Sequence, residues 1–256
     1  MINLFVSDID GCLSEPFRPF DRQRLQELAA YAGAAGPVER ESVLPAVSLC
    51  SGRAFPYVEA LTQVLGLQVP VLFESGGGLY DPISGEVSWH PAFTADIEEA
   101  VEEVRRWMIR ECIPGTSLAY DYGKRIQAGV AGIDLDEVAA CVPVIEAFVA
   151  RHFPALCVFH TPISIDVLSR SITKREGLLW LAERVGCPVD RMAYIGDTNG
   201  DLGALETVGY SFAPANAGKA VKRQVQRVTD GPLIEGVLES YRWCIARNEA
   251  QRKKAS

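Results

Sequence analysis

Two carboxylates, Asp8 and Asp10, stand two residues apart in the segment Ser7-Asp8-Ile9-Asp10-Gly11. They follow the short apolar run Leu4-Phe5-Val6, which predicts a buried strand. Open α/β sheets bind their ligands at the carboxyl ends of parallel strands, so both side chains could be aimed at one point beyond this strand. Taken alone, the pattern fits a solvated junction between strand and loop equally well.

A second acidic pair, Asp197 and Asp201, follows the apolar run Met192–Ile195 within Gly196-Asp197-Thr198-Asn199-Gly200-Asp201. Four acids at one edge of a sheet, with no basic run nearby, would repel one another. A hard cation such as Mg²⁺ would relieve that repulsion, because it prefers oxygen ligands. The sequence therefore predicts a metal site formed by Asp8, Asp10, Asp197 and Asp201.

Groups that suit an anion follow two other elements. Ser51-Gly52-Arg53 comes just after the apolar run Ala46–Leu49 and offers a hydroxyl and a guanidinium near a predicted helix start. Lys174 stands at the start of another predicted helix, where it opposes the helix dipole and suggests an anionic partner. Each feature also has a plainer explanation, as a helix cap or a surface lysine.

The elements that would position these groups alternate between strand and helix. This rhythm predicts an α/β fold with a doubly wound parallel sheet. We expect its strands at residues 4–6, 46–49, 69–73 and 192–195. We expect its helices at residues 21–32, 55–65 and 174–185.

Residues 81–167 break the parallel rhythm. Turn residues at 80–85 are followed by an amphipathic helix with Thr94 as its N-cap, and a second helix opens at Asp134. Strands are expected at 117–122, 125–130, 156–160 and 164–168. We therefore predict a core formed by residues 1–80 and 168–256, with an inserted α+β domain at 81–167.

The composition excludes several classes of protein. The 256 residues are 48% hydrophobic and 23% charged, as in soluble globular proteins, and the net charge of −8 disfavours a nucleic-acid partner. The chain has no apolar run of about 18 residues for a membrane span, and its start lacks the basic region of a signal peptide. Seven cysteines without a C-x-x-C motif predict reduced thiols. We expect a cytoplasmic protein with no membrane partner.

As a set, the motifs D-x-D-G, S-G-R, lysine and G-D-x-x-x-D resemble the haloacid dehalogenase (HAD) superfamily of phosphatases. The resemblance covers about residues 1–80 and 168–240. The insert lies where that family places type C2 caps, and Glu74-Ser75-Gly76-Gly77 is similar to the E-N-G-G stretch that leads into them. The strand pattern of the cap resembles the C2B branch with the sucrose-phosphate, mannosyl-3-phosphoglycerate and trehalose-phosphate phosphatases and the phosphomannomutases.

The resemblance implies catalysis through an aspartyl phosphate. Asp8 would be the nucleophile, and Asp10 would protonate the leaving oxygen and then activate water. Ser51 would donate a hydrogen bond to a phosphoryl oxygen, and Lys174 would offset the charge on the phosphate and on Asp8.

The resemblance also implies how Mg²⁺ is held. The Asp8 carboxylate, the Asp10 backbone carbonyl and Asp197 would bind the ion, and Asp201 would support it directly or through water. The substrate phosphate is expected to contact Ser51, Gly52, Arg53, Lys174 and Asn199.

Three positions depart from the family pattern. Cys12 replaces a threonine, Ser75 an asparagine, and Gly200 an asparagine whose amide Asn199 could supply instead. None removes the nucleophile or the lysine, so we expect a Mg²⁺-dependent phosphatase of a small phosphorylated metabolite, with a sugar phosphate as the expected class. The alternatives are a phosphomutase and a catalytically weak protein that binds phosphorylated metabolites.

Substrate choice should depend on the cap, which is large enough to favour small metabolites over phosphoproteins. Tyr120, Tyr122, Lys124 and Arg125 could face a sugar or a second anion, although a solvated hairpin is also compatible with them. Trp89-His90-Pro91 could form a contact on the hinge side, but packing at the cap entry is the expectation we favour. We expect a monomer or a weak dimer.

Overall fold

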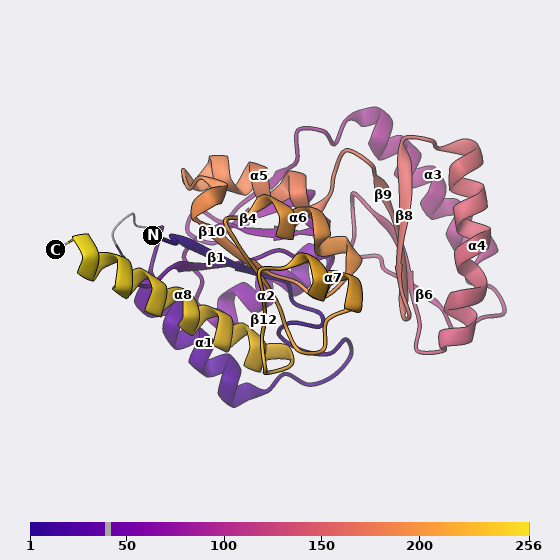
Figure 1. Ribbon diagram of the computed structural model, residues 1–256. Coiled ribbons are helices and arrows are strands. Elements are labelled where there is room, and N and C mark those ends of the chain that lie inside the picture. Colours follow the sequence, from indigo (N-terminus) through magenta and orange to yellow (C-terminus); the bar gives the residue numbers. More distant parts are fainter. Residues whose placement is uncertain (39–41, 256) are drawn as a thin grey trace.

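The computed structural model describes residues 1–38 and 42–255. Figure 1 shows an α/β core on the left and a smaller cap on the right, joined by connecting segments. The predicted fold class, a parallel α/β core with an inserted α+β cap, is confirmed. No described helix is long and apolar enough to cross a membrane.

The core is built on a parallel sheet with the strand order β12-β11-β10-β1-β2. In its centre Ser7 pairs with Leu49 on one side and with Ile195 on the other, so three strands end at the same level. The motifs that follow these strands therefore leave the sheet side by side. The strands are β1 (Leu4–Ser7), β2 (Ala46–Leu49), β10 (Met192–Ile195), β11 (Tyr210–Ala213) and β12 (Arg227–Val228).

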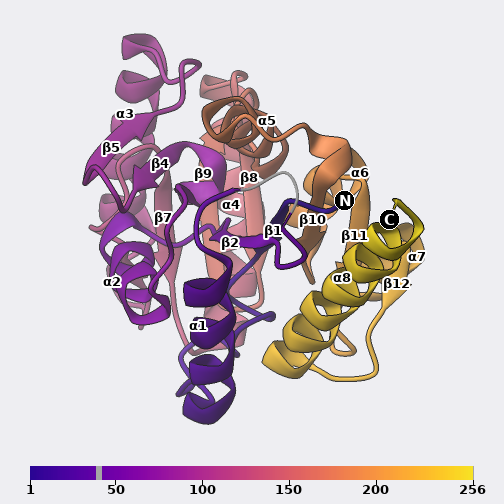
Figure 2. The same cartoon turned by 90° about the vertical axis from the view of Figure 1, so that its left-hand side faces the viewer.

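Helices cover both faces of this sheet, which explains why its three central strands β10, β1 and β11 and the neighbouring β2 are mostly apolar and buried. Phe5 points into the cluster under α1, α2 and α8, whereas Leu4 and Val6 point into the cluster under α5, α6 and α7. Figures 1 and 2 show the C-terminal α8 beside the N-terminal α1. These helices are α1 (Arg22–Ala35), α2 (Phe55–Leu65), α5 (Lys174–Val185), α6 (Leu202–Thr207), α7 (Lys219–Gln224) and α8 (Leu233–Ala255).

The expected strand at 69–73 is β3 (Val71–Phe73), which lies beside β2 through a parallel bridge between Cys50 and Leu72. It also forms an antiparallel sheet with β4 (Gly78–Asp81) and β5 (Glu86–Trp89). Trp89 meets the ring of Phe73 edge-on at 5.4 Å, so this hairpin packs on the core. The proposed boundary between core and cap at residues 80 and 81 therefore falls within the hairpin.

The cap holds an antiparallel sheet with the strand order β6-β7-β9-β8. Helices α3 and α4 cover its outer face, and its other face is turned toward the core (Figure 1). Thr94 and Asp134 accept backbone N–H groups at the starts of these two helices, as predicted. The elements are α3 (Ala95–Glu111), β6 (Ala119–Tyr120), β7 (Ala128–Ala131), α4 (Leu135–His152), β8 (Leu156–Thr161) and β9 (Ser164–Ser169).

The strands expected at 117–122 and 125–130 are wrong in extent, because β6 and β7 cover only 119–120 and 128–131. The segment 121–127 between them leaves the cap sheet and reaches the core. There the N–H groups of Arg125 and Ile126 donate to the buried carboxylate of Glu74 instead of to a neighbouring strand.

Candidate active site

A cavity of about 500 Å³ lies between the core sheet edge and the cap. Both acidic motifs and both anion-binding motifs meet there, as the aligned strand ends require. The predicted residues that line it are Asp8, Asp10, Ser51, Gly52, Arg53, Lys174, Asp197 and Asn199. Asp201 is fully buried and hydrogen-bonded to Lys174.

Asp8 is held on both of its carboxylate oxygens. The N–H of Ile9 donates to Oδ1 at 2.7 Å, and the Lys174 ammonium donates to Oδ2 at 2.6 Å. Burial raises the pKa of Asp8 well above its ordinary value, and the charge of Lys174 opposes that shift. The side chain is therefore fixed in direction, with its charge dependent on nearby cations.

Lys174 joins Asp8 to Asp201, because its Nζ also lies 2.7 Å from Asp201 Oδ1. Burial lowers the pKa of Lys174, but the charges of Asp201 and Asp8 outweigh this effect and raise it well above the ordinary value. The ammonium is thus a permanent positive charge beneath the cavity.

Asp201 is saturated with hydrogen bonds. Besides Lys174, the Tyr194 hydroxyl donates to Oδ1, while the Thr198 hydroxyl and the N–H groups of Asp197 and Thr198 donate to Oδ2. Burial raises the pKa of Asp201, but Lys174 and these donors lower it below its ordinary value. A carboxylate with this many donors is better suited to hold Lys174 and the 197–198 loop than to bind an ion directly.

The acidic cluster as a whole fits a hard cation. One oxygen from each of Asp8, Asp197 and Asp201 lies within 4.8 Å of the others. Asp197 Oδ1 is buried without a hydrogen-bond partner in the described structure, which is an unfavourable state for a carboxylate oxygen. Burial and the charge of Asp201 raise the pKa of Asp197 to about 7. Clustered carboxylates with an unpartnered oxygen are the donor set that Mg²⁺ prefers.

The backbone after Asp10 packs against this cluster. Gly11 has a positive φ of 77°, and the Asp197 carboxylate occupies the space where a side chain at position 11 would begin. Only glycine fits both conditions. Asn216 fixes the loop by donating from Nδ2 to the Gly11 carbonyl at 2.8 Å.

Arg53 contacts Asp10 in this structure. Its Nε and Nη2 donate to the two carboxylate oxygens at 2.6 and 2.7 Å, in the bidentate geometry that guanidinium and carboxylate groups favour. The guanidinium carbon also lies 4.9 Å from the ring centre of Tyr57. Sequence reasoning assigned Arg53 to the phosphate, and the structure adds a second task, the orientation of Asp10.

Comparison with known proteins gives a consistent result. Residues 134–240 match the family model of haloacid dehalogenase-like hydrolases. Over this second part of the chain, the sequence is similar to that family. A phosphoglycolate phosphatase of Natronomonas pharaonis is 28% identical over 254 residues, which cover 94% of this chain and 96% of the relative. Both findings support the enzyme class expected from the sequence, a phosphatase.

Solved structures agree on the fold. A Thermoplasma acidophilum protein superposes with a TM-score of 0.76 at 22% identity, over 95% of this chain and 98% of the other. The sucrose-phosphatase of Synechocystis, solved with sucrose and phosphate, superposes with a TM-score of 0.67 at 17% identity, over 97% and 98% of the two chains. At such identities the structures show a shared fold.

Two of the three departures from the HAD pattern, Ser75 and Gly200, lie at the cavity wall. A side chain at Gly200 would meet only the Thr198 hydroxyl, at 3.5 Å, so an asparagine would have room there. Asn199 lines the cavity, so its amide is accessible there. Ser75 also lines the cavity, whereas Cys12 is buried with its Sγ 3.8 Å from the Ile195 carbonyl.

The cap wall contains one of the four cap residues proposed from the sequence, Lys124. Tyr120 is buried and its hydroxyl accepts a hydrogen bond from Arg105, while Tyr122 is 78% exposed. Arg125 pairs with Glu98 and lies 4.9 Å from the ring centre of Trp89, which packs at the cap entry as expected.

Sequence reasoning missed Asp166, which lines the cavity beside Lys124. One signal was present: polar Ser164 and Asp166 alternate with buried Ile165 and Val167 along β9, which marks one face of the strand as accessible.

Sequence reasoning also underrated Glu74, which it placed only at the cap hinge. This core carboxylate accepts N–H groups from Arg125 at 3.0 Å and Ile126 at 2.7 Å, and burial raises its pKa to about 7. The Ile126 side chain fills the space above Gly77. Glu74 and Gly77 therefore dock the segment that carries Lys124 onto the core.

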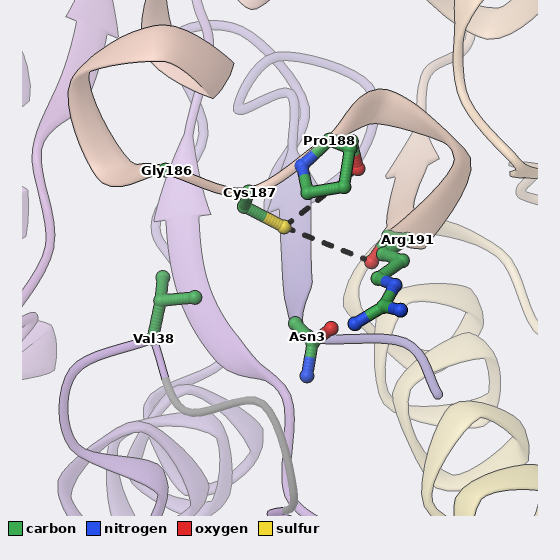
Figure 3. A pocket seen from close by; sticks show the side chains of 6 residues that line it. All are labelled: Asn3, Val38, Gly186, Cys187, Pro188 and Arg191. Carbon is green, nitrogen blue, oxygen red and sulfur yellow. Dashed lines mark hydrogen bonds between the residues drawn. The ribbon is translucent and has the colours of Figure 1, made fainter.

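A second, smaller pocket of about 180 Å³ lies at the opposite end of the core strands (Figure 3). It is lined by Asn3, Val38, Gly186, Cys187, Pro188 and Arg191. The Cys187 thiol donates to the carbonyls of Pro188 and Arg191, so it is part of a local turn. This lining has no acidic cluster among the residues that the structure describes.

Proposed function

We propose that this phosphatase is Mg²⁺-dependent and hydrolyses a small phosphorylated metabolite through an aspartyl phosphate on Asp8. The observation that carries the proposal is the position of Asp8. It is tied to Lys174, borders an acidic cluster with an unpartnered oxygen on Asp197, and opens onto a cavity closed by the cap.

The chain's own residues supply most of the steps. An Asp8 oxygen attacks the phosphorus, while Lys174 and the Ser51 hydroxyl stabilise charge on the transferring group. Arg53 holds the Asp10 carboxyl at the cavity wall. From there Asp10 protonates the leaving oxygen and later takes a proton from water. When bound by Asp8, Asp197 and the Asp10 backbone carbonyl, Mg²⁺ would neutralise charge on the phosphoryl oxygens.

Size limits the substrate to a small metabolite, because the cap closes a cavity of about 500 Å³ over the nucleophile. The Natronomonas pharaonis relative is named phosphoglycolate phosphatase, so phosphoglycolate belongs in any substrate panel. Sugar phosphates belong there too, since hydroxyl groups can pair with the polar side chains of the cap wall.

A phosphate-release screen over such a panel, with and without Mg²⁺, tests the proposal. Release that requires Mg²⁺ supports it. Isomerised product without release would indicate a phosphomutase, and binding without turnover would indicate a binding protein.

Metal binding should stabilise the fold. We expect Mg²⁺ to raise the melting temperature of the wild type, because the ion binds only the folded arrangement of the acids. Asp197→Asn should lose most of this gain. Asp190→Asn, which changes an exposed acid far from the cavity, should keep it. A normal Mg²⁺ response of the Asp197→Asn protein in a thermal melt would remove Asp197 from the ligand set.

The role of Asp10 depends on the leaving group. We expect Asp10→Asn to slow turnover of alkyl phosphates about 10²–10⁴-fold, the usual contribution of general acid–base catalysis. Transfer from p-nitrophenyl phosphate to Asp8 should be slowed much less, because that leaving group needs little protonation. Rapid-quench measurement of phosphoryl transfer to Asp8 gives the rate of this first step for each ester. Equal losses with both esters would contradict a general-acid role.

A further inference from the structure

The cap wall of the cavity carries an ion pair that the proposed chemistry does not use. Lys124 is 8% exposed, and its Nζ lies 2.5 Å from Asp166 Oδ1. A second carboxylate, Asp121, is 3.9 Å from the same nitrogen. All three residues line the cavity that also contains Asp8 and Asp10, so the pair faces the same space as the proposed nucleophile.

The cap sheet is shaped to seat this pair. Gly129 on β7 is directly opposite Asp166 on β9. A side chain at position 129 would collide with Asp166 Oδ1 and would lie 3.5 Å from Lys124 Nζ. The glycine therefore leaves the space through which Lys124 reaches across the strand to Asp166.

The position of Lys124 is also fixed from the core. Its neighbours Arg125 and Ile126 donate their N–H groups to Glu74, and the backbone at Gly123 lies close to Ala54. The residues before and after Lys124 therefore both contact the core, and these contacts fix the position of the ammonium at the cavity.

The chemistry of the pair suits a hydroxyl group. An ammonium has three N–H donors and one of them goes to Asp166, while the two carboxylates retain free lone pairs. A hydroxyl both accepts and donates, so it can bind the ammonium and a carboxylate together. A carboxylate on the substrate would gain Lys124 but would face two like charges, Asp121 and Asp166.

We propose that Lys124 and Asp166 form a specificity-determining subsite that binds the terminal hydroxyl on the part of the substrate beyond the phosphate. The inference rests on the proposed function and narrows its substrate class to hydroxylated esters such as polyol or sugar phosphates. It disfavours esters that carry a carboxylate in place of that terminal hydroxyl, such as 3-phosphoglycerate.

The test compares two esters of the same length. Glycerol 3-phosphate has a terminal hydroxymethyl group where 3-phosphoglycerate has a carboxylate. For the wild type, kcat/KM should favour glycerol 3-phosphate about 10- to 100-fold, the range that one hydrogen bond to a charged group supplies. Asp166→Asn should reduce this ratio at least about tenfold, through a higher KM for glycerol 3-phosphate and a lower KM for 3-phosphoglycerate.

Two controls separate specificity from damage to the fold. Glu103→Gln removes an exposed carboxylate on α3 outside the cavity, and should leave the ratio unchanged. Its hydrolysis of p-nitrophenyl phosphate should also stay within about twofold of the wild type. A wild type that prefers 3-phosphoglycerate, or an unchanged ratio in Asp166→Asn, overturns the subsite.

Failure of the proposed function gives a different result. If the wild type hydrolyses none of these esters with Mg²⁺, including p-nitrophenyl phosphate, the proposed phosphatase chemistry is wrong. The two esters then remain intact, so their Kd values can be measured by calorimetry. For the wild type and for Asp166→Asn, the Kd values give an affinity ratio of the two esters that replaces the ratio of kcat/KM. An affinity ratio that favours glycerol 3-phosphate and falls in Asp166→Asn supports the subsite, and any other ratio overturns it.

Discussion

Asp8→Asn should abolish turnover, with a loss of at least about 10⁴-fold in kcat, as expected when a nucleophile is removed. An amide cannot accept the phosphoryl group, so the quenched protein should show no phosphorylated species by intact mass. The loss should occur without unfolding. Burial raises the pKa of Asp8 well above its ordinary value, which means that the folded state disfavours its charge. A neutral amide of the same shape should leave the melting temperature of the metal-free protein unchanged or higher.

The control for this prediction lies two residues away. Asp10→Asn keeps Asp8, so it should still form the phosphorylated species from p-nitrophenyl phosphate and should accumulate it, because the base that activates water is missing. A phosphorylated species on Asp8→Asn, or turnover within tenfold of wild type, would show that another residue is the nucleophile.

The convergence of the motifs was predictable because it requires only that the strands before them are parallel members of one sheet. Apolar runs before Asp8, Ser51 and Asp197 predicted buried parallel strands, and such strands end at one edge of a sheet. The observed register, with Ser7 opposite both Leu49 and Ile195, is the simplest case of this rule.

The direction of long side chains was not predictable in the same way. Arg53 has several rotatable bonds and two candidate anions nearby, the substrate phosphate and Asp10. Which one it contacts depends on Tyr57 and on the exact path of the loop, neither of which the motif Ser51-Gly52-Arg53 encodes.

The pair formed by Lys124 and Asp166 could not be predicted from the sequence for a different reason. Lys124 and Asp166 are 42 residues apart, and they meet only because Gly129 is paired with Asp166 across β7 and β9. Local patterns predict that strands exist, but the register between strands that are far apart in sequence depends on packing of the whole domain.

Lys174→Met should lower the free energy of unfolding of the metal-free protein by about 3–5 kcal/mol, the usual cost of removing one partner from a buried ion pair. The ammonium lies within 2.7 Å of oxygens on both Asp8 and Asp201, and all three side chains are buried. Without it, these acids would have to be protonated or remain as uncompensated charges. Turnover should fall at least about 10²–10³-fold, because a fixed positive charge beneath the transferring group is lost.

The adjacent residue on α5 provides the matched control. Arg175 is half exposed and pairs with Glu176 at the surface, so Arg175→Met should change stability by less than about 1 kcal/mol. Urea unfolding of both variants, with and without Mg²⁺, measures the difference.

Mg²⁺ should restore part of the stability lost in Lys174→Met, since a cation at Asp8 and Asp197 offsets the same negative charge. A Lys174→Met protein as stable as Arg175→Met without Mg²⁺ would mean that Asp8 and Asp201 do not depend on the ammonium, and the charge balance inferred for the site would be wrong.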